Sequence, residues 1–282
     1  MSGRVYAVAS GKGGVGKTTT VVNLSVVLRA SGYTVAVVDA DLGMANLGIA
    51  LNATHDPTLH DVLSGNASLD DALFEPAEGY GLLVGDTELS RFANVKPARL
   101  TSVFDELAER YDIVFIDSGA GLNYEVILSL GLVDAAILVS MPDPTSIEDT
   151  RKTTELMSRI GTQVAGVVVT RTIDGTDPET VAERIGTRLL AAIPDDEAVL
   201  RSIEAGQPLE TFAPESAAAV TYRRLGEVVA GKRKPPALPL DEDELSAPDD
   251  SEPPEEENEK IEEEEEDEET AEEEEDGDER GS

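Results

Sequence analysis

The stretch "SGKGGVGKTTT", residues 10–20, decides the fold, because it carries a complete phosphate-binding pattern at a junction of a strand and a helix. The pattern G-x-x-x-x-G-K-[ST] is met by Gly11, Gly16, Lys17 and Thr18. Before it, "RVYAVAS" (4–10) predicts a strand; after it, "KTTTVVNLSVVLRASG" (17–32) predicts a helix that ends on a glycine. A second lysine at position 12 is not required by the pattern and needs an explanation.

This loop suits a nucleotide, since glycines let backbone N–H groups approach phosphates and the following helix start adds partial positive charge. Lys17 is expected to pair with the β- and γ-phosphates of ATP, and the Thr18 hydroxyl to ligate Mg²⁺. A turn that only joins strand to helix is the alternative, which the register of motif, strand and helix disfavours. The predicted nucleotide-binding residues here are Gly11, Lys12, Gly13, Gly14, Val15, Gly16, Lys17, Thr18 and Thr19.

Short β-branched runs alternate with helical patterns along the first 230 or so residues. The expected strands are residues 4–10, 34–40, 80–86, 111–118, 135–141, 165–172 and 188–194. Most are continuous apolar runs, which is typical of strands covered by helices on both faces. A further helix is expected around 146–160, with Thr145 and Glu148 as its capping pair. We therefore predict an α/β fold with a doubly wound, mostly parallel sheet and helices on both faces, as in P-loop nucleotide hydrolases.

Aspartates stand at the ends of two of the expected strands. "VVDADLG" places Asp39 and Asp41 at one strand end, and "IVFIDSGAG" places Asp117 at another. The carboxyl ends of parallel strands face the ligand crevice. Asp117 is expected to hold the metal through water, and Asp39 or Asp41 to orient the attacking water. Each alone could be an ordinary turn or cap aspartate, but three beside a phosphate loop favour nucleotide hydrolysis.

Charge divides the chain unevenly. The net charge is −36, and residues 235–282 hold 26 of the 58 acidic residues with a net charge of −24. We predict a nucleotide-binding domain over 1–234 and a disordered acidic tail over 235–282, because the tail has almost nothing apolar to bury. The remaining net charge of −12 and only 7 lysines suggest solvation for high salt. An acidic domain also disfavours DNA as a partner.

The sequence has no cysteine, no leader-like start and no apolar run near the ~20 residues of a membrane-spanning helix. These features exclude disulfides and thiolate metal sites. We expect a cytoplasmic protein.

Several stretches resemble the MinD/ParA family of ATPases. "KGGVGKTT" resembles the family's deviant Walker A motif, whose extra lysine is a signature. "VVDADLGMANLG" and "DSGAGL" resemble the switch I and switch II segments of the MinD branch, while "VVVTRT" and "IPDDEAVLRSIEAGQPL" resemble the stretches that enclose adenine. The likeness covers roughly residues 3 to 230.

The resemblance implies a slow ATP hydrolase that dimerises with ATP, Lys12 reaching the phosphates bound by the partner subunit. It implies that Asp41 orients the attacking water, that Asp39 supports the metal and water network, and that Asn46 senses the nucleotide. By position, the adenine contacts would be Thr170, Arg171, Pro194 and Asp195. The two histidines, His55 and His60, are predicted to be surface residues without a role.

Two features depart from the MinD pattern. Gly119 stands where many MinD proteins have proline, and "RRLGEVVAGKRKPP" leads into acid and proline instead of a basic amphipathic membrane helix. Membrane binding through such a helix is therefore disfavoured. The expected function is spatial positioning of a cellular machine, such as the division site or a polar motility or chemosensory assembly, through an unidentified activating or cargo protein. The dimer would reach a pole or mid-cell through that partner. A ParA-like partition ATPase and a non-hydrolysing scaffold are alternatives. A third alternative, an electron-transfer or metal-cluster loading ATPase, is disfavoured because the sequence has no cysteine.

Overall fold

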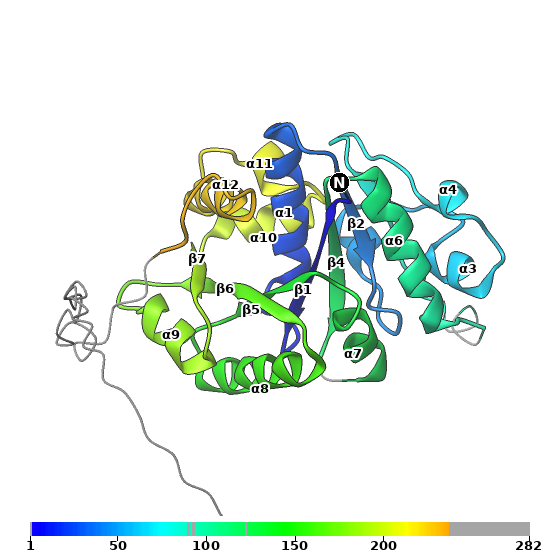
Figure 1. Ribbon diagram of the computed structural model, residues 1–282. Helices are drawn as coiled ribbons and strands as arrows, with labels where there is room; N and C mark the ends of the chain where they lie inside the picture. The colour runs from blue at the N-terminus through cyan, green and yellow to red at the C-terminus, as the bar shows by residue number, and fades with distance from the viewer. Residues whose placement is uncertain (1, 89–90, 92–93, 122, 237–282) are drawn as a thin grey trace, which may run out of the picture. The chain divides into compact units, whose positions relative to one another are not determined.

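A seven-stranded, all-parallel sheet forms the centre of the protein in the computed structural model, which describes residues 2–88, 91, 94–121 and 123–236 (Figure 1). The strands are β1 (Arg4–Ser10), β2 (Val35–Asp39), β3 (Gly81–Leu83), β4 (Ile113–Ala120), β5 (Ala135–Ser140), β6 (Gln163–Thr172) and β7 (Leu189–Pro194). Their order in the sheet is β3-β2-β4-β1-β5-β6-β7. Each overlaps one of the predicted strands, so the predicted fold is confirmed.

Helices cover both faces of this sheet (Figure 1). On one face lie α1 (Lys17–Ala30), α10 (Glu197–Glu204), α11 (Leu209–Phe212) and α12 (Ala217–Val229). On the other lie α3 (Leu59–Ser64), α4 (Leu69–Ala72), α6 (Leu100–Arg110), α7 (Tyr124–Leu130), α8 (Pro144–Ile160) and α9 (Pro178–Ile185). The short α2 (Leu47–Ala50) follows β2, and the 3-10 turn η1 (Pro97–Arg99) precedes α6.

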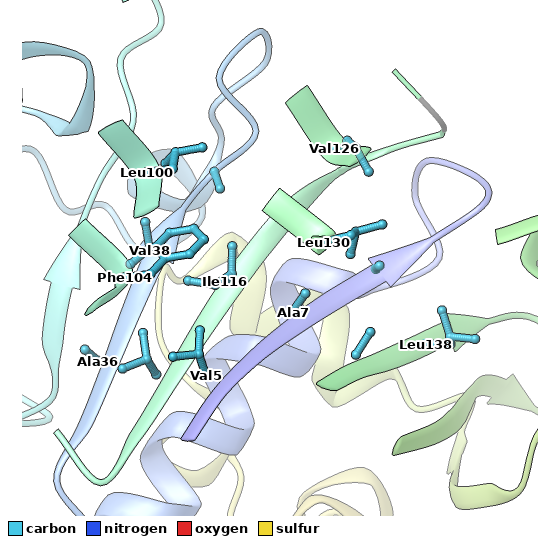
Figure 2. Packing of buried hydrophobic residues seen from close by; sticks show 14 of the residues in the cluster. Val5, Ala7, Ala36, Val38, Leu100, Phe104, Ile116, Val126, Leu130 and Leu138 are labelled. Carbon is cyan, nitrogen blue, oxygen red and sulfur yellow. The ribbon is translucent and has the colours of Figure 1, made fainter. Parts of the chain in front are cut away.

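The sheet contributes side chains to two separate hydrophobic cores, because successive strand residues point to opposite faces. In β1, Val5 and Ala7 join the core under α6 and α7, whereas Tyr6 and Val8 join the core under α1 and α12. Figure 2 shows the first core, where Val5 and Ala7 lie beside side chains from β2, β4 and the two helices. Two-sided burial explains the continuous apolar runs of the strands.

The sheet order places β1 at a switch point, between β4 on one side and β5 on the other. In open α/β sheets, ligands bind outside the carboxyl ends of the strands at such a point. The phosphate loop begins there, directly after Ser10. The sequence motif and the topology therefore indicate the same crevice.

The start of α8 corrects one prediction. The helix begins at Pro144, and its N-cap is Asp143, whose side chain accepts the Ser146 N–H at 3.0 Å. The predicted capping pair of Thr145 and Glu148 is wrong: Thr145 is already helical, and Glu148 pairs with Arg151. Proline suits the first helical position, since that residue needs no N–H partner, and this moves the cap to the residue before it.

Predictions for the C-terminal tail fall almost entirely outside the described residues, which end at Pro236. Across the described part of the chain, no helix has both the length and the apolar character to cross a bilayer.

Candidate functional site

The phosphate loop depends on glycine at specific positions. Gly14 and Gly16 have φ angles of 75° and 99°, a region that L side chains rarely adopt. Gly11 lies against the first turns of α8, where an added Cβ would sit 2.2 Å from the backbone carbon of Asp149. A side chain at Gly11 would clash with α8, and one at Gly14 or Gly16 would strain the backbone of the loop.

Thr18, in the first turn of α1, contacts Asp117 of β4 and Asn46 in the segment after β2. Its hydroxyl donates to Asp117 Oδ2 at 2.6 Å, and it lies 3.1 Å from Asn46 Oδ1. Asp117 is 3% exposed, and in the sheet it lies beside Asp39 of the neighbouring strand. The predicted meeting of these strand ends at the phosphate loop is thus observed.

Asp39 organises the segment that follows β2. Its Oδ2 accepts the N–H groups of Asn46 and Leu47 at 3.0 and 2.9 Å, and its Oδ1 accepts that of Asp41 at 3.3 Å. Both oxygens of this 1% exposed side chain are thereby engaged with backbone. Its part in a metal and water network stays a prediction.

Burial shifts the ionisation of this cluster. Burial is the main cause that raises the pKa of Asp39 to about 7, and the charge of Asp117 is the second. Burial raises the pKa of Asp117 to about 6, against the opposing effects of the Thr18 hydrogen bond and the Lys17 charge. Burial also lowers the pKa of Lys17, although the Asp117 and Asp41 charges oppose that shift. Two buried carboxyls lie side by side, and the charge of Lys17 acts on that of Asp117, so the cluster is suited to receive a further cation.

The donor set fits Mg²⁺. Asp117 Oδ1 is buried and has no hydrogen-bond partner among the described residues, and the Thr18 hydroxyl lies beside the same carboxylate. Oxygen ligands of this kind are those that Mg²⁺ takes, usually through water and with nucleotide phosphates completing its shell. Thr18 and Asp117 would hold the ion, which supplies positive charge against the phosphates.

Stability without metal should fall as the pH rises from about 4 to about 7. Both carboxyls bind protons more tightly in the folded chain than in the unfolded one, where the aspartate pKa is about 3.9. The folded state therefore holds more protons in this window, and each group lowers the free energy of unfolding by up to about 1.4 kcal/mol per pH unit. Urea denaturation in EDTA across this range measures the slope.

A variant at Asp39 shows how much of this pH dependence comes from that carboxyl. Asp39→Asn should remove the share of Asp39 and so make the slope less steep than in the wild type. The background from the other acidic residues is common to both proteins. An Asp39→Asn protein with the wild-type slope would contradict the raised pKa.

Asp41 lies in the turn after β2 and faces the switch II segment. Its Oδ1 accepts the Met44 N–H at 3.2 Å, and a Cβ added to Gly119 would lie 3.1 Å from that oxygen. A side chain larger than glycine at position 119 would therefore press on this carboxylate. Asp41 also lies near enough to Lys17 to affect its pKa, so the structure brings Asp41, Lys17 and Asp117 together.

Lys12 is partly exposed and pairs with the start of α8. Its Nζ is 3.5 Å from Asp143 Oδ1 at the start of α8, and its side chain is 40% exposed. An exposed pair of this kind contributes about 0–1 kcal/mol. Lys12 can leave Asp143 at little cost, and its backbone carbonyl is meanwhile held by the Ser10 hydroxyl at 2.7 Å.

A cavity of about 290 Å³ opens beside the phosphate loop. All four predicted adenine residues line it: Thr170, Arg171, Pro194 and Asp195. Thr170 mainly supports the loop, because its hydroxyl donates to the Val15 carbonyl at 2.8 Å. Arg171 has a φ of 53°, rare for a residue with a side chain, and is exposed at the rim.

Several further residues of this cavity were not named individually from the sequence. They are Ile193, Asp196, Val199, Leu200 and Ile203, which lie in the stretch predicted to enclose adenine, and Tyr222, which lies outside it. Leu200 and Ile203 are 60% and 43% exposed, unusual for large aliphatic side chains on one helix face. Apolar residues on the exposed side of α10 were the signal that could have identified them.

The histidine prediction is wrong for His60, which is 1% exposed and hydrogen-bonded on both ring nitrogens. His55 is half-buried, stacked on Phe74 with ring centroids 4.4 Å apart.

Comparison with known proteins agrees with this geometry. The model of the CobQ/CobB/MinD/ParA nucleotide binding domain matches residues 6–209. An uncharacterised ATP-binding protein of Methanocaldococcus jannaschii is 34% identical over 232 residues, which is 80% of this chain and 88% of that protein.

Two solved structures are also similar. The cell division ATPase MinD of Pyrococcus furiosus is 33% identical with a TM-score of 0.78, over 82% of this chain and 100% of that one. The septum site-determining protein MinD of Pyrococcus horikoshii, complexed with Mg-ADP, is 34% identical with a TM-score of 0.76, over 80% and 95% of the two chains.

Proposed function

The chain belongs to the CobQ/CobB/MinD/ParA family of nucleotide-binding proteins, and from that premise we propose that it uses an ATP-driven dimer to control the position of a larger cellular assembly. It is a P-loop ATPase that binds ATP with Mg²⁺. Residues 1–234 form the ATPase domain of this proposal, and residues 235–282 form an acidic tail that hydrolysis does not require. The observation that carries the proposal is the place of Lys12 in the phosphate loop, with a partly exposed side chain whose pair with Asp143 is weak enough to be exchanged for a second subunit's phosphates.

The roles within one subunit follow from position. Lys17 and the N–H groups at the start of α1 bind the β- and γ-phosphates. Asp41 orients the attacking water, since it faces the phosphate loop from the turn after β2 and its neighbours hold it by backbone hydrogen bonds. The apolar side of α10 covers the base in the cavity beside the loop.

Lys12 completes a second subunit's site. Beside Lys17 alone it would meet like charge, but the phosphates of a partner-bound ATP supply negative charge for it, as they do for an arginine finger. Its contact with Asp143 is exposed and weak, so exchange for a phosphate is favourable. ATP would therefore couple dimer formation to hydrolysis.

Lys12→Ala should weaken ATP-dependent dimerisation and hydrolysis while sparing the binding of ADP by the monomer. The side chain contributes to the partner's phosphates and not to its own loop, so the Kd for ADP should stay within about threefold. Light scattering with ATP measures the dimer, and calorimetry measures ADP binding. A variant that loses ADP binding as completely as Lys17→Ala would contradict the role across the dimer.

Positioning can be tested in cells with a fluorescent fusion. The wild-type protein should gather at a pole or at mid-cell, and Asp41→Ala should redistribute because the cycle stops in the ATP-bound dimer. A uniform signal that does not respond to Asp41→Ala would contradict a positioning role. A pattern that follows the nucleoid would instead support partition, which the acidic domain disfavours.

A further inference from the structure

His60 on α3 connects two loops through its ring. Nε2 lies 2.9 Å from the Leu42 carbonyl oxygen, and Nδ1 lies 3.0 Å from the Asp86 backbone nitrogen. A backbone N–H can only donate, so Nδ1 accepts, and the ring proton is on Nε2, which donates to Leu42. A neutral ring in this one tautomer satisfies both contacts.

The Leu42 carbonyl belongs to the turn that carries Asp41. Leu42 is 3% exposed, whereas Met44, two residues on, is 78% exposed. The opposite side of this segment is held by the Asp39 carboxylate, which accepts the Asp41 N–H. The turn is thus fixed from its N–H side by Asp39 and from its carbonyl side by His60.

The Nδ1 side of the His60 ring contacts a loop that ion pairs hold in place. Asp86 follows β3, and its carboxylate pairs with Arg91 at 3.1 Å. Arg91 also pairs with Asp61, the residue after His60, at 2.7 Å. The Asp86 N–H that donates to Nδ1 therefore belongs to a segment that is held to α3 in two ways, by this hydrogen bond and by the ion pairs of Arg91.

We propose that His60 is a positioning residue for ATP hydrolysis, which holds Asp41 in register with the attacking water through the Leu42 carbonyl. The inference rests on the proposed catalytic role of Asp41. His60 does not line the nucleotide cavity, so its effect falls on the rate and not on nucleotide affinity. A displacement of about 1 Å in a catalytic group can lower a rate about 100-fold.

Three substitutions separate positioning from packing. The amide nitrogen of His60→Gln reaches the place of Nε2 and can donate to Leu42. The side chain of His60→Asn reaches only the place of Nδ1. His60→Leu keeps the apolar volume and loses both hydrogen bonds. Positioning predicts that His60→Gln stays within about threefold of wild-type kcat, while the other two lose about 10- to 100-fold. The Kd for ADP should change by less than about threefold in all three.

A purely structural histidine gives a different result. His60→Gln would then be as slow as His60→Leu, or ADP affinity and rate would fall together; either outcome overturns the proposal. The wild-type protein offers a readout that needs no variant, because ¹⁵N NMR distinguishes the two neutral tautomers. His60 should show Nε2–H, and an Nδ1–H tautomer would overturn the geometry.

A double variant separates this inference from the function on which it rests. If His60 acts through Asp41, adding His60→Leu to Asp41→Ala should not lower the residual single-turnover rate further; an additional 10-fold loss would overturn positioning. Asp41→Ala that hydrolyses ATP at the wild-type rate would instead show that the catalytic assignment had failed, whatever the His60 variants do.

Discussion

Lys17→Ala should abolish ATP binding. Lys17 is the cation at the start of α1, beside Asp117 and Asp41, and the phosphates would lose their main charge partner. Removing one member of a buried charge pair costs about 2–5 kcal/mol, which corresponds to about 30- to 5000-fold in Kd. The loss should appear as an ATP-induced rise in Tm that is present in the wild type and absent in the variant.

A second lysine provides the control. Lys152→Ala removes an exposed lysine of α8 that pairs with Asp149 at 3.3 Å. It should leave the ATP-induced rise in Tm unchanged. If Lys17→Ala still gained the full rise, the phosphates would bind elsewhere and the loop assignment would be wrong. A Lys17→Ala protein with an unchanged Tm without nucleotide would show that the loss is one of binding and not of folding.

The strands and the acidic edge were predictable because burial on both faces leaves a strong pattern. Runs such as 34–40 and 111–118 are apolar without alternation, as a covered parallel strand requires. Since parallel strands end at one edge, the aspartates near their carboxyl ends had to meet; Asp39 and Asp117 lie in register on neighbouring strands. One motif and one topological rule therefore located most of the site.

Contacts between distant segments were not predictable in this way. The resemblance located four residues of the cavity beside the loop, but the part that Tyr222 of α12 adds depends on how this helix packs against the sheet, and no local pattern contains that packing. His60 lies on a helix of six residues, too short for periodicity to assign it to the buried face. The cap of α8 was different: Pro144 is a local signal that places the cap at Asp143, and the predicted pair of Thr145 and Glu148 took no account of it.

Inferences from composition are weaker than those from the motif and the strand pattern. The high-salt hypothesis rests on acidic excess alone, which describes solvation and does not identify an environment. It stays a prediction, as does the disorder of the tail.

Asp41→Ala should trap the ATP-bound dimer. The carboxylate orients the attacking water and makes no contact needed for phosphate binding, so the variant should bind ATP and dimerise as the wild type does. Removing a general base or a water-positioning group lowers a rate by about 10²- to 10⁴-fold. Because dissociation of the dimer requires hydrolysis, the dimer should accumulate. Light scattering in molar KCl with ATP should give the mass of two chains.

The same dimerisation assay also distinguishes the roles of Asp41 and Asp117. Asp117→Ala removes the carboxylate that holds the Thr18 hydroxyl at 2.6 Å, so it should weaken Mg²⁺-dependent ATP binding and give no dimer. Asp105→Ala, at an exposed position of α6, should behave as the wild type. A monomeric Asp41→Ala protein that still binds ATP would place Asp41 in dimer formation and not in hydrolysis. A dimer that hydrolyses ATP at the wild-type rate would remove Asp41 from the catalytic set, and another acid would then have to orient the water.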